Sequence, residues 1–384
     1  MNLRLWMFGL PSKDYETILD ELRSLGFSDI VIGTQNTEQV KAIKDRGLKV
    51  HAVIVAFRLY NNLKRPEYLA EDPLGRKHVW FNSGCPNNPT IRSKCLEIVE
   101  EWITKYEVDG IILDGIRFAS PGSGLDVFAT CFCKHCEAKA KENGFNFNKM
   151  KRALLELLKL TRTAPRLLYE SMMGHYVNLF HLLISYDGLL DWIEFRSECI
   201  AEHIRDVRNL VKSVSSSIEL GAYVFTPSLA PLVGQCYYKI SEYLDLVKPM
   251  IYRIGRGVAC FNYELYIIIK DLLRWNPELK EADVMSFIYN VFSLSGELPS
   301  KLDDLLEHGL PYEVLERETL MARALIPSSG TLHPIIMLRD KGVERATELM
   351  LKAKVDGIDF FMFKEELRDN IRKAVRVVNS FITH

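Results

Sequence analysis

Two sets of chemically reactive residues occur in one stretch of the chain, residues 108–136. The first set is Asp114 and Arg117, which follow the apolar run GIIL. A carboxylate at the carboxyl end of a buried strand can act as a nucleophile or as a general acid or base. A nearby arginine would keep that carboxylate ionised and orient it. The pair therefore predicts a catalytic site with Asp114 as a reacting group and Arg117 as its electrostatic partner beside the substrate.

The second set is Cys131, Cys133 and Cys136 in the segment CFCKHC. A closed structural zinc site needs four ligands, and thiolates at this spacing can surround one ion. His135 lies directly beside Cys136 and is poorly placed to turn toward the same ion, so Cys85 in the turn GCPNNP is the expected fourth ligand. An all-thiolate set is typical of a structural zinc, which would here join two long loops. The alternative is a group of buried free thiols, because cysteine is among the most buried residue types.

Short apolar runs alternate with amphipathic helical segments along the chain. Strands are expected at Leu3–Phe8, Asp29–Ile32, Lys49–Phe57, Gly110–Leu113, Glu219–Val224, Pro249–Tyr252, His333–Leu338 and Gly357–Phe361. Helices are expected at Lys13–Leu25, Glu38–Asp45, Ile91–Tyr106, Ile193–Val214, Ile240–Val247, Val343–Lys354 and Lys364–Phe381. Such alternation forms a parallel sheet, and eight units predict one (β/α)8 barrel, or TIM barrel, over residues 1–384. The first strand lacks a glycine-rich fingerprint, so neither a dinucleotide-binding domain nor an organic cofactor is expected.

Three connections in this barrel are expected to be long. Residues 58–90 follow strand three, and residues 115–191 follow strand four and carry the three cysteines with helices at Phe145–Leu160 and Arg166–Ile184. Residues 276–325 are expected as a mostly helical insertion before strand seven. Val284–Phe292 could itself be strand seven, but His333–Leu338 leads directly into the last helix and strand. The first two connections lie on the rim that carries barrel active sites, and connections of this length are usually functional.

A glycosidase needs two carboxyl groups, about 5–5.5 Å apart for retention and about 6.5–9.5 Å apart for inversion. Asp340, after strand seven, is the preferred partner of Asp114. It could instead cap the helix that follows it. Glu365 and Glu366, after strand eight, are typical acids of a first helical turn. The second carboxylate is therefore less clearly indicated than the first.

Several side chains near the strand ends are candidates for contact with a substrate. Aromatic rings stack on the flat C–H faces of sugars, and rings are frequent in these segments. The candidates are Arg117, Trp80, Trp6, Tyr252, Arg253 and His51. Among the aromatic candidates, Trp80 is the least typical of a core residue, because it lies on a polar loop. His51 lies early on strand three and could equally be a hydrogen-bonded core histidine.

The composition is that of an ordinary globular protein, with 48% hydrophobic residues, 26% charged residues and a formal net charge of −1. This charge balance gives no reason to expect nucleic acid, an anionic membrane or a polyanionic substrate as a partner. No apolar run approaches the length of a membrane span, and the N-terminal segment does not resemble a secretory signal. The eight cysteines are therefore expected as thiols or metal ligands in a reducing cytoplasm. Whether the chain forms a homo-oligomer is left open.

The segment HVWFNSGCPNNPTIRSKCLEIVEEWITKYEVDGIILDGIRF resembles glycoside hydrolases of the (β/α)8 glycosidase superfamily. Those proteins often show a tryptophan loop, an Asn-Pro turn, a long helix and then a strand of the form D-G-I-x-L/F-D-x-I-R-F/Y. The segments DWIEFRSECIAEHIRDVR, KPMIYR and KVDGIDFFMF are similar to later elements of the same proteins. The resemblance implies a barrel that acts on carbohydrate.

The cysteines carry a second resemblance, to the family 42 β-galactosidases. Those enzymes have a C-x-C-x2-C cluster after strand four, and a cysteine upstream completes a zinc site. Cys85, Cys131, Cys133 and Cys136 match this layout in order and approximate spacing. That family has an Asn-Glu pair at strand four, where this chain has Asp114-Gly115, and this chain has no clear nucleophilic glutamate at strand seven. The resemblance thus extends to the fold and the metal more directly than to the catalytic pair.

Together these patterns predict a glycoside hydrolase-like enzyme that cleaves a glycosidic bond, with a structural zinc. Two alternatives remain open. A barrel that binds carbohydrate without cleaving it would explain the missing second carboxylate. A barrel lyase or isomerase could use Asp114 as a base.

Overall fold

The chain forms alternating strands and helices, and the computed structural model describes residues 3–163 and 184–382. The strands are β1 (Arg4–Phe8), β2 (Asp29–Ile32), β3 (Lys49–Val55), β4 (Ala70–Glu71), β5 (Lys77–His78), β6 (Gly110–Asp114), β7 (Glu219–Phe225), β8 (Leu246–Met250), β9 (Thr331–Leu332), β10 (Ile335–Met337) and β11 (Gly357–Phe361). The α-helices are α1 (Tyr15–Ser24), α2 (Thr37–Asp45), α3 (Pro89–Lys105), α4 (Leu125–Phe128), α5 (Lys134–Glu142), α6 (Phe147–Thr163), α9 (Gly188–Val214), α10 (Tyr237–Ile240), α11 (Phe261–Trp275), α12 (Glu281–Val291), α13 (Leu302–His308), α14 (Glu313–Leu325), α15 (Val343–Leu351) and α16 (Arg368–Ile382).

The central sheet is parallel and closes into a barrel. Its strands follow the order β10-β11-β1-β2-β3-β6-β7-β8-β9, and β9 and β10 are two pieces of one strand separated by His333 and Pro334. The His333 amide donates to Val247 on β8 at 2.9 Å, and the Pro334 carbonyl accepts from Asp359 on β11 at 3.1 Å. The two ends of the sheet therefore meet, and the barrel has eight strand positions. The expected (β/α)8 architecture is confirmed.

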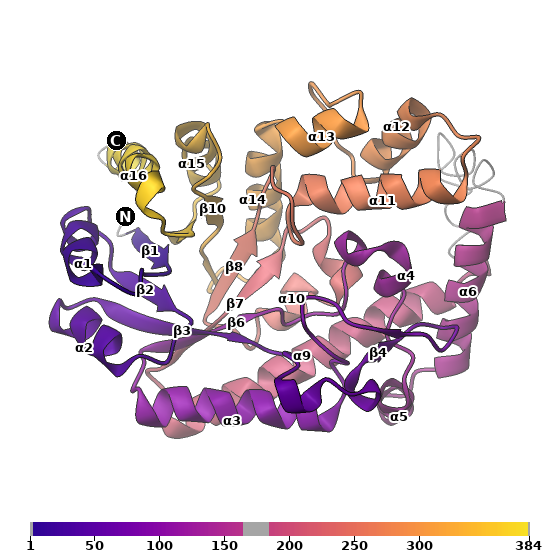
Figure 1. The fold of residues 1–384 in the computed structure, drawn as a ribbon, viewed down its shortest axis with the longest axis horizontal. Helices are drawn as coiled ribbons and strands as arrows, with labels where there is room; N and C mark the ends of the chain where they lie inside the picture. The colour runs from indigo at the N-terminus through magenta and orange to yellow at the C-terminus, as the bar shows by residue number, and fades with distance from the viewer. Residues whose placement is uncertain (1–2, 164–183, 383–384) are drawn as a thin grey trace.

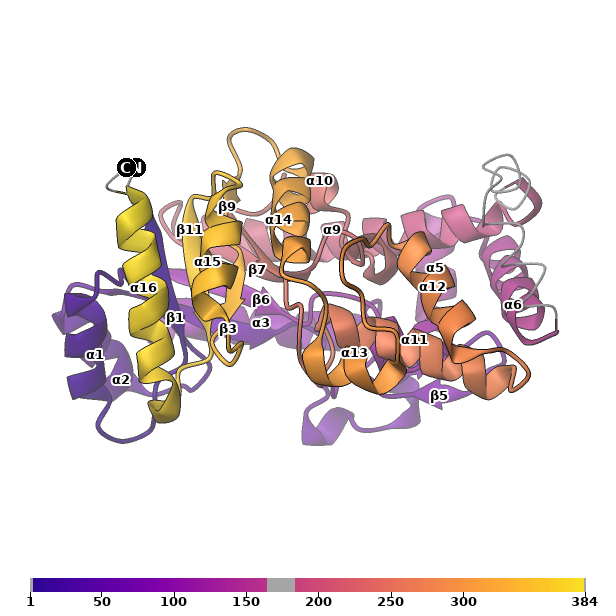
Figure 2. The same cartoon turned by 90° about the horizontal axis from the view of Figure 1, so that it is seen from above.

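The long connections lie on one side of the barrel. Figure 1 shows α1, α2, α15 and α16 around the strands on the left, whereas α4, α5, α6, α11, α12 and α13 extend to the right. The view from above in Figure 2 has the same division. Residues 166–183 of the helix expected at 166–184 lie outside the described residues. The short hairpin of β4 and β5 belongs to the connection after β3.

Local sequence explains the elements that position the site. Asn88 caps α3, since its side-chain oxygen accepts from the amides of Thr90 and Ile91 at 3.0 and 3.3 Å, and Pro89 suits the first helical position. The helix then leads into β6, whose first four residues are buried, as is typical of a strand covered on both faces. Asp114 is the last residue of β6. The strand therefore delivers a carboxylate to the carboxyl-end rim of the barrel.

Two expected elements after β7 were wrong. Residues 240–247 were expected as a helix, but α10 ends at Ile240 and β8 begins at Leu246. The sixth strand consequently begins three residues before the expected Pro249. Lys248, which lies between the expected helix and the expected strand, belongs to β8, where its ammonium group is buried and pairs with the Asp359 carboxylate. By contrast, Val284–Phe292 lies largely in α12, and the later segment supplies strand seven, as expected.

Charged side chains fill the amino-terminal part of the barrel interior. Arg4 donates to both oxygens of Asp29 and to both oxygens of Glu219, at 2.5–3.2 Å. His51 contacts the same Asp29 carboxylate at 2.8 Å. Asp29, His51 and Glu219 are close enough together to hold a metal ion. Because the Arg4 guanidinium already pairs with both carboxylates, we interpret this group as a structural ion-pair network.

Candidate active-site cavity and cysteine cluster

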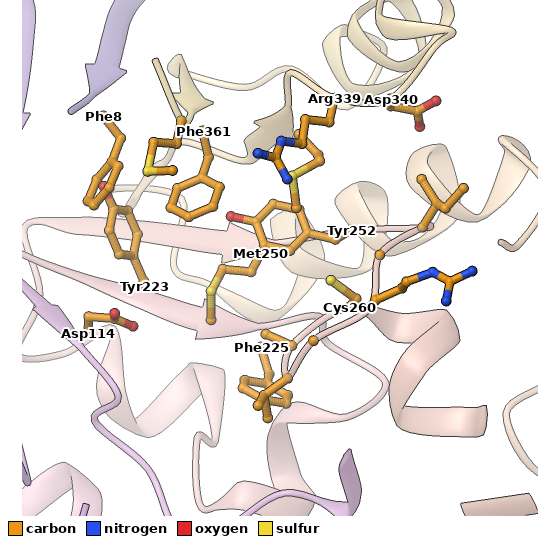
Figure 3. A pocket seen from close by; sticks show the side chains of 18 of the residues that line it. Phe8, Asp114, Tyr223, Phe225, Met250, Tyr252, Cys260, Arg339, Asp340 and Phe361 are labelled. Atoms are coloured by element: carbon orange, nitrogen blue, oxygen red, sulfur yellow. The ribbon is translucent and has the colours of Figure 1, made fainter. Parts of the chain in front are cut away.

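A cavity of about 520 Å³ opens at the carboxyl ends of the barrel strands. It is lined by residues at the ends of six strands, namely Phe8, Asp114, Tyr223, Phe225, Met250, Met337 and Phe361. Figure 3 shows the side chains of Phe8, Asp114, Tyr223, Phe225, Met250 and Phe361 around one hollow. Pockets of about 300–1,000 Å³ are typical of small-ligand sites, and the carboxyl-end rim is where barrel enzymes have their active sites. The cavity is therefore the candidate active site.

Asp114 is a half-buried carboxylate at this cavity. The Gly115 amide donates to its Oδ1 at 2.7 Å, and its Oδ2 has no hydrogen-bond partner within the described ranges. Burial raises the pKa of Asp114, while the Gly115 hydrogen bond and the charge of Arg117 act in the opposite direction with smaller effect. The surroundings thus favour the protonated carboxyl group more than water does.

Arg117 also lines the cavity, but it is not ion-paired with Asp114. Its guanidinium stacks on Trp80 at 4.7 Å and on Phe225 at 4.8 Å, and it donates to the Phe118 carbonyl at 2.9 Å. The side chain is only 2% exposed, and burial lowers its pKa to about 10. The expectation that Arg117 keeps Asp114 ionised is therefore corrected, because burial outweighs its charge.

Asp340 contributes the other carboxylate of the cavity wall, and it is fully engaged. Its Oδ2 accepts from Arg253 Nε at 2.8 Å, and its Oδ1 accepts from Arg253 Nη2 at 3.2 Å and from the Tyr312 hydroxyl at 2.8 Å. The Gly342 amide also donates to Oδ1 at 3.2 Å, but Gly342 is itself the N-cap residue of α15 and no side chain caps that helix, so Asp340 is not the helix cap expected as the alternative. Figure 3 places Asp340 and Asp114 at opposite ends of the pocket. Arg253, expected to bind substrate, is instead committed to Asp340.

Tyr223 connects the cavity to a buried ion pair inside the barrel. Its hydroxyl donates to Asp359 Oδ2 at 3.2 Å, and Lys248 Nζ donates to the same oxygen at 3.0 Å. Lys248 and Asp359 have no exposed surface, and burial lowers the pKa of Lys248. Sequence reasoning did not select these residues. The available signal was a charged residue at an inward-facing position of two otherwise apolar strands, KPMIY and GIDFF.

Besides Arg253, three other expected substrate contacts lie outside the cavity. Trp6 is fully buried in the barrel interior, with its ring 4.1 Å from that of His51 and 3.4 Å from Lys248 Nζ. His51 is fully buried against Asp29, and burial lowers its pKa. Trp80 is 2% exposed because Arg117 covers it. These positions correct the expectation of substrate contact for all three, while Tyr252 does line the cavity.

The four cysteines of the expected metal site come together. The sulfur atoms of Cys85, Cys131, Cys133 and Cys136 all lie within 4.8 Å of one another, and the four side chains are buried. Cys85 Sγ is 3.4 Å from Cys133 Sγ and 3.6 Å from Cys136 Sγ. Four thiolates around one zinc, with bonds of about 2.3 Å, have sulfur atoms about 3.8 Å apart, so the cluster fits a tetrahedral ion.

Amide groups point at the sulfur atoms of this cluster. The backbone amides of Asn87 and Glu71 lie 3.4 and 3.3 Å from the sulfurs of Cys85 and Cys131, and the Asn87 side-chain amide donates to Cys136 at 3.3 Å. Such donors stabilise negative sulfur and orient it toward a metal. His135 contacts Asn88 at 3.2 Å, in keeping with the expectation that it does not join the ligand set.

Burial and mutual contact perturb the thiols strongly. Burial raises the pKa of Cys85 and of Cys136, and hydrogen bonds from the other three thiols lower the pKa of Cys133. Several thiolates cannot share this small volume without a cation, because like charges repel in a medium of low dielectric constant. The four cysteines could therefore hold a metal ion, and their all-sulfur composition would suit a structural one.

Comparisons with known proteins identify the fold. No protein-family model matches the sequence, and no curated protein matches it significantly. Among solved structures, the chain resembles a β-galactosidase from the psychrophilic Marinomonas ef1, with a TM-score of 0.58 and 12% identity over 99% of this chain and 59% of that one. It resembles a catalytic mutant of Gan42B, a GH42 β-galactosidase from G. stearothermophilus, with a TM-score of 0.57 and 12% identity over 99% of this chain and 56% of that one.

A shorter structure matches along nearly its whole length. The catalytic domain of β-amylase from Paenibacillus polymyxa has a TM-score of 0.56 and 11% identity over 99% of this chain and 98% of that one. The chain thus spans 59% and 56% of the two β-galactosidases and almost all of the β-amylase domain. At such identities the similarity establishes the architecture, a (β/α)8 barrel of the type found in these glycosidases. None of the helices described above has both the length and the apolar character needed to cross a membrane.

Proposed function

We propose that this protein hydrolyses a glycosidic bond at the mouth of its barrel, with Asp114 as the general acid. One observation carries the proposal: Asp114 faces the cavity, forms no ion pair among the described residues, and has a pKa raised by burial. A general acid must hold a proton until the leaving oxygen needs it, and burial is how proteins raise carboxyl pKa values for this purpose. The similar fold of known glycosidases supports the same chemistry.

In this proposal the Oδ2 atom of Asp114 carries the proton. Oδ1 is held by the Gly115 amide, which fixes the carboxyl group relative to β6. The rings of Phe8, Tyr252 and Phe361 line the same cavity and offer apolar faces for a sugar. As the bond to the departing sugar breaks, its oxygen receives the Asp114 proton. Water completes the hydrolysis, and Asp114 recovers its proton from that water.

We do not assign Asp340 as the second catalytic carboxylate, because Arg253, Tyr312 and Gly342 already occupy its oxygens. The same observation favours a second candidate function, a barrel that binds carbohydrate without cleaving it. A cavity with one free acid and several rings suits a binding protein as well. Turnover distinguishes the two functions.

We also propose that Cys85, Cys131, Cys133 and Cys136 hold a structural zinc. The sulfur distances and the converging amide donors support this assignment. Cys85 belongs to the connection after β3, and the other three belong to the connection after β6. The bound ion would therefore tie two rim connections together and supply no reacting group.

The test of function is a panel of neutral and acidic oligosaccharides, scored for new reducing ends and for binding. We expect the wild type to cleave at least one member. Asp114→Asn is expected to lose at least about 100-fold in kcat/KM while its circular dichroism and melting temperature stay unchanged. Asp303→Asn, which alters an exposed carboxylate on α13, is the matched control. Binding without cleavage by the wild type would establish the binding protein instead.

A further inference from the structure

Basic side chains surround the cavity. Arg117, Arg256, Arg339 and Lys364 all line it, and they follow β6, β8, β10 and β11 respectively. Arg117 is buried between aromatic rings, whereas Arg256 and Arg339 are exposed and Lys364 is half-buried. Three cationic side chains from three different strand ends are therefore accessible to solvent at the same cavity.

These three cations have no partner of their own within residues 3–163 and 184–382. None of them forms an ion pair, a side-chain hydrogen bond or a ring contact there, although arginines elsewhere in the molecule pair readily, as Arg323 does with Asp356. The cavity wall has two carboxylates, Asp114 and Asp340, and Arg253 already neutralises the second. The cavity is thus a positively charged hollow in a chain whose formal net charge is −1.

We infer that the substrate of this cavity is an acidic glycan, whose carboxylate or sulfate group is bound by Arg339, Arg256 and Lys364. The inference rests on the proposed function and narrows its substrate class. A cleft lined by charges of one sign concentrates counter-ions, and a guanidinium donates two parallel hydrogen bonds to an oxyanion. The neighbouring rings bind the sugar faces, so one hollow recognises both halves of an acidic sugar.

The position of Arg339 indicates where the acidic group binds. In Figure 3 the Arg339 side chain extends over the cavity beside Tyr252 and Phe361, on the side away from Asp114. An anion bound beside Asp114 would oppose ionisation of that carboxyl group, which must lose and regain its proton in each cycle. An acidic group held by Arg339 is displaced from the reacting bond. It therefore serves recognition and orientation.

The test compares glycans that differ only in charge. The probes are uronate oligosaccharides, the same oligosaccharides after carboxyl reduction to neutral sugars, and sulfated neutral oligosaccharides. Binding to Asp114→Asn is measured by calorimetry and turnover by the wild type is measured in parallel. We expect at least about tenfold tighter binding of one acidic class than of its neutral counterpart, and weaker binding as salt rises from low to physiological concentration.

Variants locate the site of this preference. Arg339→Gln, Arg256→Gln and Lys364→Gln are each expected to weaken binding of the acidic probe about three- to tenfold and to leave binding of the neutral probe unchanged. Arg65→Gln and Lys64→Gln remove exposed cations from the connection after β3, outside the cavity wall, and are the matched controls. Equal losses in the controls would overturn the assignment to this cavity.

The outcomes separate the inference from the function. Cleavage of neutral glycans without preference for acidic ones overturns the inference and leaves the hydrolase. Tight binding of acidic glycans without turnover supports the inference and rejects the hydrolase. No binding of any probe overturns both. Preference for the uronate or for the sulfated class identifies the source of the negative charge.

Discussion

Asp340 and Arg253 form a bidentate ion pair at the cavity wall, with N–O distances of 2.8 and 3.2 Å. The pair leaves Asp114 as the one carboxylate, among the described residues lining the cavity, that has no cation bound to it. This asymmetry separates the two acids that the sequence indicates as catalytic groups, Asp114 and its less clearly indicated partner Asp340. Asp340 is bound within the rim, and Asp114 faces the cavity.

Asp340→Asn is expected to destabilise the protein more than it impairs catalysis. Removing one partner of a buried ion pair costs about 3–5 kcal/mol, so we expect a lower free energy of unfolding. The remaining folded enzyme should lose no more than about tenfold in kcat/KM. Chemical denaturation and steady-state kinetics on the same preparation measure both effects. A loss of about 1,000-fold or more with little loss of stability would make Asp340 the second catalytic group.

The buried pair of Lys248 and Asp359 leads to a second prediction. Asp359→Asn leaves the Lys248 ammonium without a counter-charge in the barrel interior, so we expect a loss of about 3–5 kcal/mol in the free energy of unfolding. The double variant Lys248→Met, Asp359→Asn removes both charges and should recover part of that stability. Urea unfolding of the three proteins measures the recovery. A double variant that is less stable than Asp359→Asn would show that the pair does not act as proposed.

The cysteine cluster predicts about one zinc per chain. Elemental analysis of protein purified without a chelator measures the zinc content. Less than about half a zinc ion per chain would refute the proposed metal site. We expect Cys133→Ser to lose the metal and to lower the melting temperature by about 5 °C or more, because metal binding contributes to folding. Cys95→Ser is the matched control, since Cys95 is a buried thiol on α3 outside the cluster. It should retain the metal.

Buried histidines predict that acid destabilises the protein. Burial lowers the pKa of His203 to about 3 and that of His333 well below its ordinary value. The unfolded chain binds these protons near pH 6.5 and the folded chain does not, so stability is lost as the pH falls below about 6.5. From His203 alone we expect a loss of about 2 kcal/mol in the free energy of unfolding between pH 7 and pH 5.

Urea unfolding at several pH values measures this loss. The phenylalanine in His203→Phe cannot take up a proton. The variant should therefore show a smaller pH dependence of the free energy of unfolding, by the amount that His203 contributes. An unchanged pH dependence in this variant would assign the acid sensitivity to other groups.

The barrel and the cluster of four cysteines could be predicted from the sequence because their signals are local. The run GIILD is a buried strand that ends in a carboxylate. Cys131, Cys133 and Cys136 all lie within one segment of six residues. The alternation of strands and helices was sufficient for the fold class. Even Cys85, which lies far upstream, could be selected by its turn sequence.

The interior charges could not be predicted, because their partners are distant in the chain. Lys248 and Asp359 are 111 positions apart, and each belongs to a short apolar strand. Without that pairing, Lys248 was left between the expected helix and the expected strand, and β8 was placed too late. The burial of Trp80 likewise depends on Arg117, which arrives from another connection and covers the ring. Such contacts exist only once the barrel has closed.

The central claim is that Asp114 gives its proton to the leaving oxygen, and the most direct test varies that oxygen. Dinitrophenyl glycosides need no proton to depart, whereas alkyl glycosides of the same sugar do. The measurement is the loss of kcat/KM in Asp114→Asn on both substrates, with the sugar identified by the oligosaccharide panel. We predict a loss at least about 100-fold larger on the alkyl glycoside. Equal losses on the two substrates would contradict the role of Asp114 as general acid.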